Sequence, residues 1–385
     1  MNTSKTKNGQ GTCMMEGDTD MSLKELLAEK DYLPVTVMND GGEVTREHWE
    51  QRRKEMLHLL EEYSYGKTPD VPVQVKGIHR DWGRYSCAGK CTEEFVDVIY
   101  TTPYGEGTIP IQIFTPENVV LPPIFLHIAF GEAPHMCIPV EEIIDYGYAL
   151  VIVDYCKMVN DAHFGDYSDG IAAHFGVSDD RKANEWGKIG MWAWGASRIL
   201  DYLIAQRPDL DTKKTAVIGQ SRLGKTALWC AAQDERFAAA ISNNSGYGGA
   251  ASSKHGSGER VTDFLKVGSW DWFCENFKSF SGELEDHKPY DQSFLLALIA
   301  PRYLLVGSAE LDRGADPKSE FLTTLHASSA WELLGEKGLV TEDRMPLPGD
   351  HLGEGKILYH YRSGKHYLSR DDWQAYVRFL DKKWK

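Results

Sequence analysis

Short apolar runs alternate with segments of helical periodicity through the middle and C-terminal parts of the chain. Strands are predicted at 148–154, 215–218, 238–242 and 302–308, and helices at 191–206, 221–234 and 292–298. This alternation predicts an α/β fold with a mostly parallel sheet and helices on both faces, where reactive groups collect at the carboxyl ends of the strands. Three earlier strands are predicted at 95–101, 109–115 and 123–129, the first two as an antiparallel start.

The sequence on either side of these strands predicts further helices. Residues 1–21 are polar and predict a flexible tail. Helices are predicted at 22–30 and 46–63, and a last helix begins near Asp371. We therefore expect a single α/β domain over residues 22–385, with residues 22–66 forming a helical extension packed on it.

Composition and charge narrow the function classes. The chain has 385 residues, 42% of them hydrophobic, and a formal net charge of −15. Because binding to phosphates needs a cationic surface, this charge excludes a general nucleic-acid binder. Residues 1–20 contain no apolar run of the kind found in signal peptides or membrane anchors. We expect a cytoplasmic monomer without membrane contacts, or a secreted protein if a leader has been removed.

The cysteines do not predict a disulfide framework or a metal site. Seven cysteines are scattered along the chain, which favours reduced thiols. Cys87 and Cys91 have the spacing of half a zinc site, but no second pair follows at a matching interval. No metal and no cofactor are therefore expected.

Residues 215–226, Thr-Ala-Val-Ile-Gly-Gln-Ser-Arg-Leu-Gly-Lys-Thr, carry the most specific motif. They predict a buried strand, a sharp turn at Ser221 and a helix from Arg222, the pattern of a nucleophile elbow. Gly219 would leave room for the turn. Arg222 and Lys225 stand in the first helical turn, where the helix dipole disfavours cations, so we expect them to hold an anionic group beside the serine.

Two other interpretations of this motif remain open. Ser221 could be an ordinary helix N-cap with both cations in solvent. The spacing from Gly219 to Thr226 also matches a phosphate-binding Walker A loop, although such a loop normally follows the first strand of its domain.

The elbow predicts an α/β-hydrolase fold, a three-layer αβα sandwich in which the nucleophile is followed along the chain by an acid and then a histidine. Two carboxylates, Glu310 and Asp312, follow the predicted strand 302–308. Asp312 is the preferred acid and Glu310 the alternative. Asp316 precedes Pro317 and is predicted to cap the next helix.

Four histidines follow Asp312 in the chain: His326, His351, His360 and His366. His366 lies after a glycine and shortly before the last predicted helix, in a loop, and is the preferred base. His351 is the alternative, while His326 falls in a predicted helix and His360 in a strand-like run. His366 would remove the Ser221 proton, Asp312 would orient the imidazole, and groups near Arg222 would hold the oxyanion.

Four segments resemble the bacterial glucuronoyl esterases of carbohydrate esterase family 15 in order and spacing, and they lie at 192–249, 291–302, 308–321 and 359–373. The first contains Trp-Ala-Trp-Gly-Ala-Ser-Arg, Gln-Ser-Arg-Leu-Gly-Lys and Ser-Asn-Asn-Ser-Gly-Tyr-Gly-Gly. The resemblance implies hydrolysis of esters between (4-O-methyl)glucuronic acid on xylan and an alcohol, without metal or cofactor. An esterase that removes acetyl or other acyl groups from sugars is the alternative, and a noncatalytic sugar- or nucleotide-binding protein a third.

The resemblance also implies roles for single residues. It makes Ser221 the nucleophile, Arg222 an oxyanion-hole residue, Lys225 a contact to sugar hydroxyls and His366 the base. Many members carry the acid where this chain has Asn244, whereas others carry an Asp at the position of Asp312, and this chain resembles the second group.

Other positions depart from the family pattern. Gly314 stands where members often have a Trp that contacts the uronic acid, and an aromatic ring is a major source of affinity. Asp271 and Ser293 each replace a usual His. Trp272 and Glu259 are substrate-binding candidates, with an exposed loop carboxylate as the alternative for Glu259.

Overall fold

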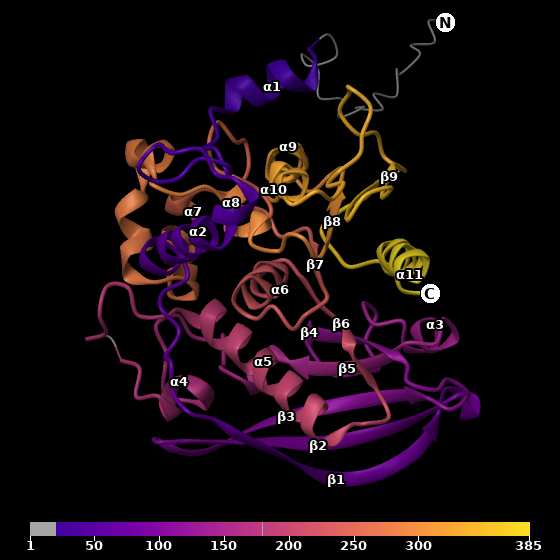
Figure 1. The fold of residues 1–385 in the computed structure, drawn as a ribbon. Coiled ribbons are helices and arrows are strands. Elements are labelled where there is room, and N and C mark those ends of the chain that lie inside the picture. Colours follow the sequence, from indigo (N-terminus) through magenta and orange to yellow (C-terminus); the bar gives the residue numbers. More distant parts are fainter. Residues whose placement is uncertain (1–20, 179) are drawn as a thin grey trace, which may run out of the picture.

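The computed structural model describes residues 21–178 and 180–385, so that positions 1–20 of the predicted tail lie outside the described residues. A ten-stranded sheet runs through the described part of the chain in the order β1-β2-β3-β5-β4-β6-β7-β8-β10-β9 (Figure 1). Its strands are β1 Gln74–Ser86, β2 Cys91–Thr102, β3 Gly105–Pro116, β4 Pro123–Ala129, β5 Ala149–Asp154, β6 Asp211–Gln220, β7 Ala239–Asn243, β8 Tyr303–Ala309, β9 His351–Leu352 and β10 Ile357–Arg362.

The six strands from β5 to β10 along the sheet are parallel, and the flanking pairs are antiparallel. The carboxyl ends of β6, β7, β8 and β10 therefore meet at one edge. These strands are almost wholly buried, which is typical of parallel strands covered on both faces. The predicted antiparallel pairing of the early strands is present as β2 and β3.

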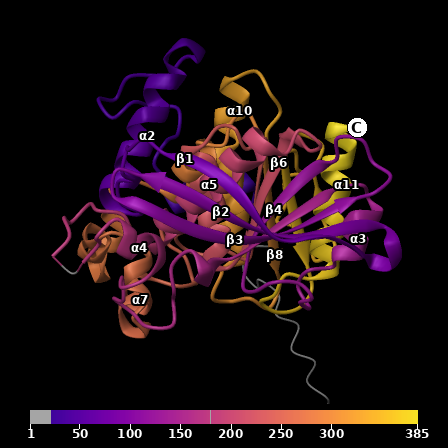
Figure 2. The same ribbon diagram turned by 90° about the horizontal axis from the view of Figure 1, so that it is seen from below.

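Helices cover both faces of the sheet (Figures 1 and 2). Their bounds are α1 Leu23–Lys30, α2 Trp49–Tyr63, α3 Val140–Asp145, α4 Gly170–His174, α5 Lys188–Gln206, α6 Arg222–Gln233, α7 Val261–Val267, α8 Gln292–Ala297, α9 Pro317–Ala327, α10 Ser329–Leu333 and α11 Arg370–Trp384. The larger core cluster takes side chains from α2, α5, α6 and α8, and the cluster on the opposite face takes them from α3 and α11. The predicted α/β-hydrolase architecture, with a mostly parallel central sheet, is confirmed.

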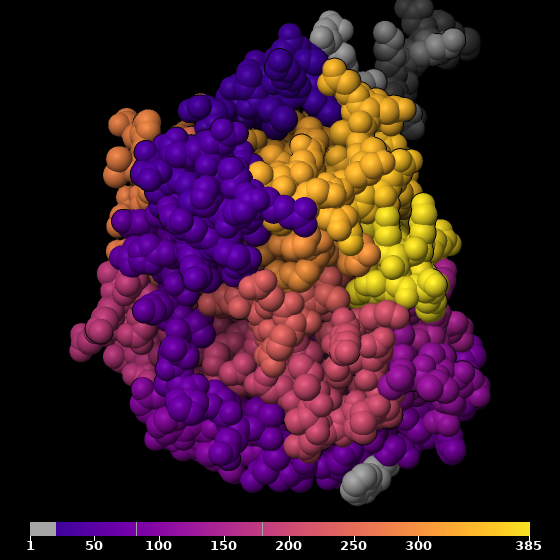
Figure 3. All heavy atoms as spheres, viewed as in Figure 1, coloured from indigo at the N-terminus to yellow at the C-terminus, as the bar shows by residue number. Residues whose placement is uncertain are grey.

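The N-terminal segment lies against the C-terminal half of the chain (Figure 3). Helix α1 begins with a capping box, in which Ser22 and Glu25 satisfy each other's backbone donors, and it packs against α9. Helix α2 packs against α8, and its buried Arg53 donates to the carbonyl of Ala232 at 2.6 Å.

Strand β1 is absent from the sequence prediction. Its residues alternate between half-buried and exposed, and none of those with a described side chain is fully buried, so the apolar signal of a strand is missing. Pairing with β2 forms it instead. At Gly77 a Cβ atom would lie 2.2 Å from the Tyr202 ring, so that only glycine lets this edge strand approach α5. No helix in residues 21–178 and 180–385 has the length and hydropathy that a bilayer crossing requires.

Candidate active site

Strand β6 and helix α6 are separated by one residue, Ser221. Its backbone has φ 59° and ψ −129°, and residues other than glycine rarely adopt a positive φ. The Ser221 N–H donates to Asn243 O at 2.8 Å. A Cβ atom on Gly219 would lie 2.1 Å from Leu223 O, so glycine is required for the close approach of strand and helix. The strand, turn and helix expected at 215–226 are therefore present.

The Ser221 side chain does not cap the helix that follows it. This disfavours the interpretation of Ser221 as a plain N-cap, because its hydroxyl is not used by the backbone. A Walker A loop binds phosphate through its backbone N–H groups. Here the N–H groups of Gly224 and Lys225 both donate to Ser221 O, so these two donors are not available to a phosphate. The geometry fits an elbow that presents a hydroxyl.

The Arg222 guanidinium is held by a buried carboxylate and an indole ring. Its Nη1 lies 2.5 Å from Asp161 Oδ2, and its Cζ lies 4.3 Å from the centre of the Trp272 ring. Trp272 donates its Nε1–H to the other oxygen of Asp161 at 2.9 Å. Asp161 is fully buried, whereas the Arg222 side chain is 30% exposed. Asp161 thus balances the cation at the helix start and leaves one side of the guanidinium open.

Asp161 belongs to a longer network that the sequence analysis did not find. Lys188, the first residue of α5, lies 3.8 Å from Asp161 and 2.8 Å from Asp271, and all three side chains are fully buried. Asp271, one of the departures from the family pattern, is therefore neutralised by a lysine. Asp161 lies in the segment after β5. Functional groups collect beyond the carboxyl ends of parallel strands, and this rule is the one feature of the sequence that points to Asp161.

Lys225 is buried at 2% exposure, and its Nζ donates to Ser245 O at 2.5 Å. Glu259, whose side chain is 43% exposed, lies 3.6 Å from Nζ. Burial lowers the pKa of Lys225, and the charge of Glu259 opposes that shift. The predicted substrate residues Lys225 and Glu259 are thus brought together, with Glu259 at the more open end of the pair.

Asp312 and His366 meet across the ends of β8 and β10. His366 Nδ1 lies 2.6 Å from Asp312 Oδ2, with Asp312 8% exposed and His366 43% exposed. The backbones of the two loops are also joined, because Glu310 N–H donates to Arg362 O and Leu311 N–H to Gly364 O, both at 2.9 Å. Since Nδ1 is occupied by the carboxylate, Nε2 is the imidazole nitrogen left for a proton transfer.

The alternative residues lie in other surroundings. His351 and His360 stack on each other with their Nδ1 atoms 3.0 Å apart, and His326 Nε2, on α9, lies 3.0 Å from Leu33 O. Asp316 accepts from Ser319 N–H and begins α9, as predicted. None of these histidines contacts Asp312 or Glu310 in the hydrogen bonds of the described residues.

Asn244 follows β7, at the position where many family members have the acid. Its Nδ2 donates to Tyr367 O at 3.3 Å and to Asn243 Oδ1 at 3.0 Å, and its φ is 45°. An amide cannot stabilise an imidazolium by charge. In this chain the side chain binds the backbone beside His366 instead.

Glu320 on α9 is a second carboxylate that the sequence did not reveal. It is fully buried, with Oε1 accepting from the N–H groups of Ser245 and Gly246 at 2.9 Å and Oε2 accepting from Ser308 at 2.5 Å. Burial raises its pKa to about 7, and the nearby Asp312 adds to that shift. Glu320 thus holds the backbone of the loop that follows β7. Its contacts are with residues far away in the chain, so no sequence motif identifies it.

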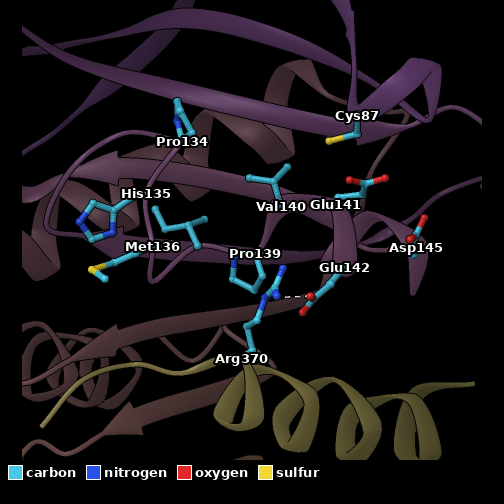
Figure 4. A pocket seen from close by; sticks show the side chains of 11 residues that line it. Cys87, Pro134, His135, Met136, Pro139, Val140, Glu141, Glu142, Asp145 and Arg370 are labelled. Atoms are coloured by element: carbon cyan, nitrogen blue, oxygen red, sulfur yellow. Dashed lines mark ion pairs between the residues drawn. The ribbon is translucent and has the colours of Figure 1, made fainter.

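Two pockets border the loop that follows β4, and one of them also borders the loop at 363–369 that carries His366. One, of about 460 Å³, is lined by residues that include Met136, Arg362 and Tyr367, the residue after His366. The other, of about 650 Å³, shares Met136 and Arg370 with it and extends to Cys87. Arg370 pairs with Glu142 in the wall of this second pocket, away from Cys87 (Figure 4). In the described ranges, no group of three or more His, Cys, Asp and Glu side chains could hold a metal ion.

The fold and the sequence both match known esterases. The sequence profile of the family described as "Glucuronyl esterase, fungi" matches residues 111–335, more than half of the chain. The solved glucuronoyl esterase of Solibacter usitatus is 33% identical, with a TM-score of 0.84 over 92% of this chain and 98% of that one. A promiscuous family 15 esterase from a marine bacterial metagenome is 32% identical, with a TM-score of 0.81 over 91% and 96%. This chain belongs to carbohydrate esterase family 15.

Curated relatives agree with this membership. A protein named carbohydrate esterase, from an unknown prokaryotic organism, is 34% identical over 90% of this chain and 88% of its own length. The 4-O-methyl-glucuronoyl methylesterase of Cerrena unicolor is 27% identical over 78% of this chain, which spans 61% of the fungal protein. The predictions that the chain is a family 15 member and a carboxylic ester hydrolase acting on carbohydrate esters are confirmed.

The departures from the family pattern have local structural consequences in this family 15 esterase. Gly314 is exposed, and a Cβ atom there would lie 4.0 Å from both Asp312 Oδ1 and Glu259 Cγ. The space beside Gly314, where other members often have a tryptophan, therefore lies open between Asp312 and Glu259. Ser293 is fully buried in α8, and its N–H donates to Asp291, the residue that caps this helix.

Proposed function

We propose that this esterase hydrolyses (4-O-methyl)glucuronoyl esters of xylan-derived saccharides through an acyl-enzyme on Ser221. His366 acts as the base, Asp312 as its carboxylate partner and Arg222 as an oxyanion-hole residue. The single observation that carries the proposal is the Asp312–His366 pair of 2.6 Å on the two loops that follow β8 and β10, at the sheet edge where Ser221 follows β6. The substrate class is supported by the names of the relatives, which include glucuronoyl esterases.

The reaction begins when Ser221 Oγ attacks the ester carbonyl carbon and His366 Nε2 takes its proton. Asp312 stabilises the resulting imidazolium through Nδ1, and Arg222 with neighbouring backbone N–H groups stabilises the tetrahedral oxyanion. The carbon–oxygen bond to the alcohol then breaks, and His366 returns the proton to that oxygen. Water attacks the acyl-enzyme with His366 again as base, which releases the uronic acid and restores Ser221.

The cations near Ser221 act on charge that develops during this reaction. The substrate ester is neutral, whereas the tetrahedral intermediate and the acid product are anionic, so Arg222 favours the later species over the substrate. Lys225 would donate to sugar hydroxyls and Glu259 would accept from them. Their separation of 3.6 Å is longer than a hydrogen bond and leaves both groups with free hydrogen-bonding capacity.

Cleavage of acetyl or other acyl esters of sugars is the second candidate, and it is favoured by the open space at Gly314 and by a related esterase described as promiscuous. The test compares kcat/KM for benzyl and methyl glucuronate with that for acetylated sugars. Uronate esters preferred by at least about tenfold support the proposal, and the reverse order supports acyl removal.

A serine-directed phosphonate probe tests the acyl-enzyme. It should label the parent enzyme at Ser221 and should not label Ser221→Ala or a denatured sample. Retention of esterase activity by Ser221→Ala would overturn the mechanism.

A further inference from the structure

Arg362, the last residue of β10, is a buried cation outside the proposed triad. It is 5% exposed. Its Nη1 donates to Ser363 O at 3.0 Å and its Nη2 to Lys365 O at 3.2 Å. Nη2 also donates to Tyr367 O, the carbonyl that accepts from Asn244. The guanidinium thus binds the backbone on both sides of His366.

Asp372 fixes Arg362 from the other end of the same loop. Arg362 Nε lies 2.8 and 3.0 Å from the two carboxylate oxygens of this fully buried residue. Asp372 also accepts from Ser369 N–H at 2.7 Å and from Ser369 Oγ at 2.6 Å, the capping box that begins α11. The Arg362–Asp372 ion pair therefore joins the end of β10 to the start of α11 across the loop that carries His366. On the same strand, His360 Nε2 also lies 3.3 Å from Asp372 Oδ1.

This loop has no regular structure of its own. Residues 363–369 form neither helix nor strand, and the side chains at 365–367 are exposed. Besides the pair with Asp312, the loop is held on the His366 side by Arg362, by the Asn244 bond to Tyr367 O and by the bond from Leu311 N–H to Gly364 O. At its far end, the buried Leu368 side chain and the bonds of Ser369 to Asp372 anchor it. The planar fork of arginine reaches three carbonyls and one carboxylate at once, which the point charge of a lysine cannot do.

From these contacts we infer that Arg362 and Asp372 are a positioning pair for the base, setting the imidazole of His366 relative to Ser221. The inference rests on the proposed role of His366. The pair touches no reacting atom, so its loss changes the geometry of proton transfer and not the binding of the sugar. A displacement of the base by about 1 Å costs about 10²-fold in turnover.

Arg362→Met and Arg362→Lys test this inference, with Arg302→Met as the matched control. Arg302 is likewise an enclosed guanidinium that donates to backbone carbonyls, among them Ala231 O at 2.8 Å and Phe237 O at 3.0 Å. It precedes β8, at the end of the strand opposite Asp312. Arg302→Met should therefore lower stability and leave the position of His366 unchanged, whereas Arg362→Met should affect both.

Steady-state kinetics on benzyl glucuronate and the rate of Ser221 phosphonylation are measured at a temperature where each variant is folded. We expect Arg362→Met to lower kcat and the phosphonylation rate by about 10²-fold each while KM stays within about threefold. Arg362→Lys should recover less than half of this loss on a logarithmic scale. Arg302→Met should leave both rates within about twofold once the folded fraction is taken into account.

Three results would overturn the inference: a turnover for Arg362→Met within about threefold of the parent, an equal loss in Arg302→Met, or full rescue by lysine. If Arg362→Met does not fold, Arg362→Lys and Asp372→Asn decide the question by the same readouts, with a loss of at least about tenfold in kcat expected for each. His366→Ala and Ser221→Ala are measured in parallel. Activity in those two variants would refute the proposed function itself, whereas their inactivity beside an active Arg362 variant refutes only the positioning role.

Discussion

His366 Nδ1 lies 2.6 Å from Asp312 Oδ2, and the loops that carry the two residues are joined by backbone hydrogen bonds. The carboxylate that pairs with the proposed base therefore lies beyond β8, while the position beyond β7 is occupied by Asn244. The buried Asn244 amide binds the base loop and leaves its own Oδ1 without a partner in the described residues.

Replacing the acid tests this assignment. We expect Asp312→Asn to lower kcat by about 10⁴-fold, because a neutral partner no longer stabilises the imidazolium or fixes its tautomer. Asn244→Ala should lower kcat by less than about tenfold, since it removes one bond to the Tyr367 carbonyl. Steady-state kinetics on a uronate ester measure both, with Glu310→Gln as the control for the neighbouring carboxylate. Equal losses at 312 and 244 would contradict the assignment.

The carboxylate that holds Arg222 should matter for turnover. Asp161→Asn weakens the bond to the guanidinium and removes the charge that balances it, so we expect kcat to fall by about 10 to 10²-fold. This is less than the roughly 10² to 10³-fold for losing an oxyanion-hole donor, because Arg222 itself remains. Asp271→Asn is the matched control, since Asp271 binds the same Lys188 but not Arg222. It should lower the melting temperature and spare kcat. Similar kinetics for the two variants would show that the network is only structural.

Glu320 predicts a pH dependence of stability. Burial raises its pKa to about 7 from an ordinary 4.5, so between these values the unfolded chain loses a proton that the folded chain keeps. The contribution of this group to stability is complete below about pH 4.5 and is lost as the pH rises through about 7. The loss amounts to about 3 kcal/mol.

Glu320→Gln removes this dependence, because glutamine resembles the protonated form. Its unfolding free energy relative to the parent should rise by about 3 kcal/mol between pH 4.5 and pH 8, as measured by urea denaturation. A difference that stays constant over this range would show that Glu320 ionises in the folded protein as it does in water.

The open space at Gly314 predicts a gain in substrate affinity. Gly314→Trp would place a ring between Asp312 and Glu259, and we expect the KM for glucuronate esters to fall by about fivefold, the equivalent of about 1 kcal/mol from an aromatic contact. KM for acetylated sugars should change less. Gly314→Ala serves as the control, since its Cβ meets no atom closer than 4.0 Å. An unchanged preference would place the sugar elsewhere.

Local patterns explain how much of the site could be predicted from the sequence. The elbow at Ser221 and the pairing of Asp312 with His366 depend on single strand ends and on chain order, and both signals are local. The roles of Asp161 and Glu320 depend on contacts with Arg222 and Ser245, which are far away in the chain, so no motif marks them.

The fold shows the same division. Strand β4 has the predicted bounds, Pro123–Ala129, because all its residues are buried. Strand β1 was missed because its side chains lie at the sheet edge and a neighbouring strand, not an apolar run, determines its course. The helix at the predicted 191–206 begins earlier, at Lys188, whose side chain is buried in an ion pair with Asp271 that is far away in the chain.

The backbone at Ser221 has a consequence for protein engineering. A positive φ at a residue with a side chain costs on the order of 1–3 kcal/mol, and glycine would relieve much of that cost. A selection for heat tolerance alone would therefore favour glycine at position 221, the proposed nucleophile, and yield stable proteins that lack the serine hydroxyl. Libraries built from this scaffold need a screen for turnover at every round.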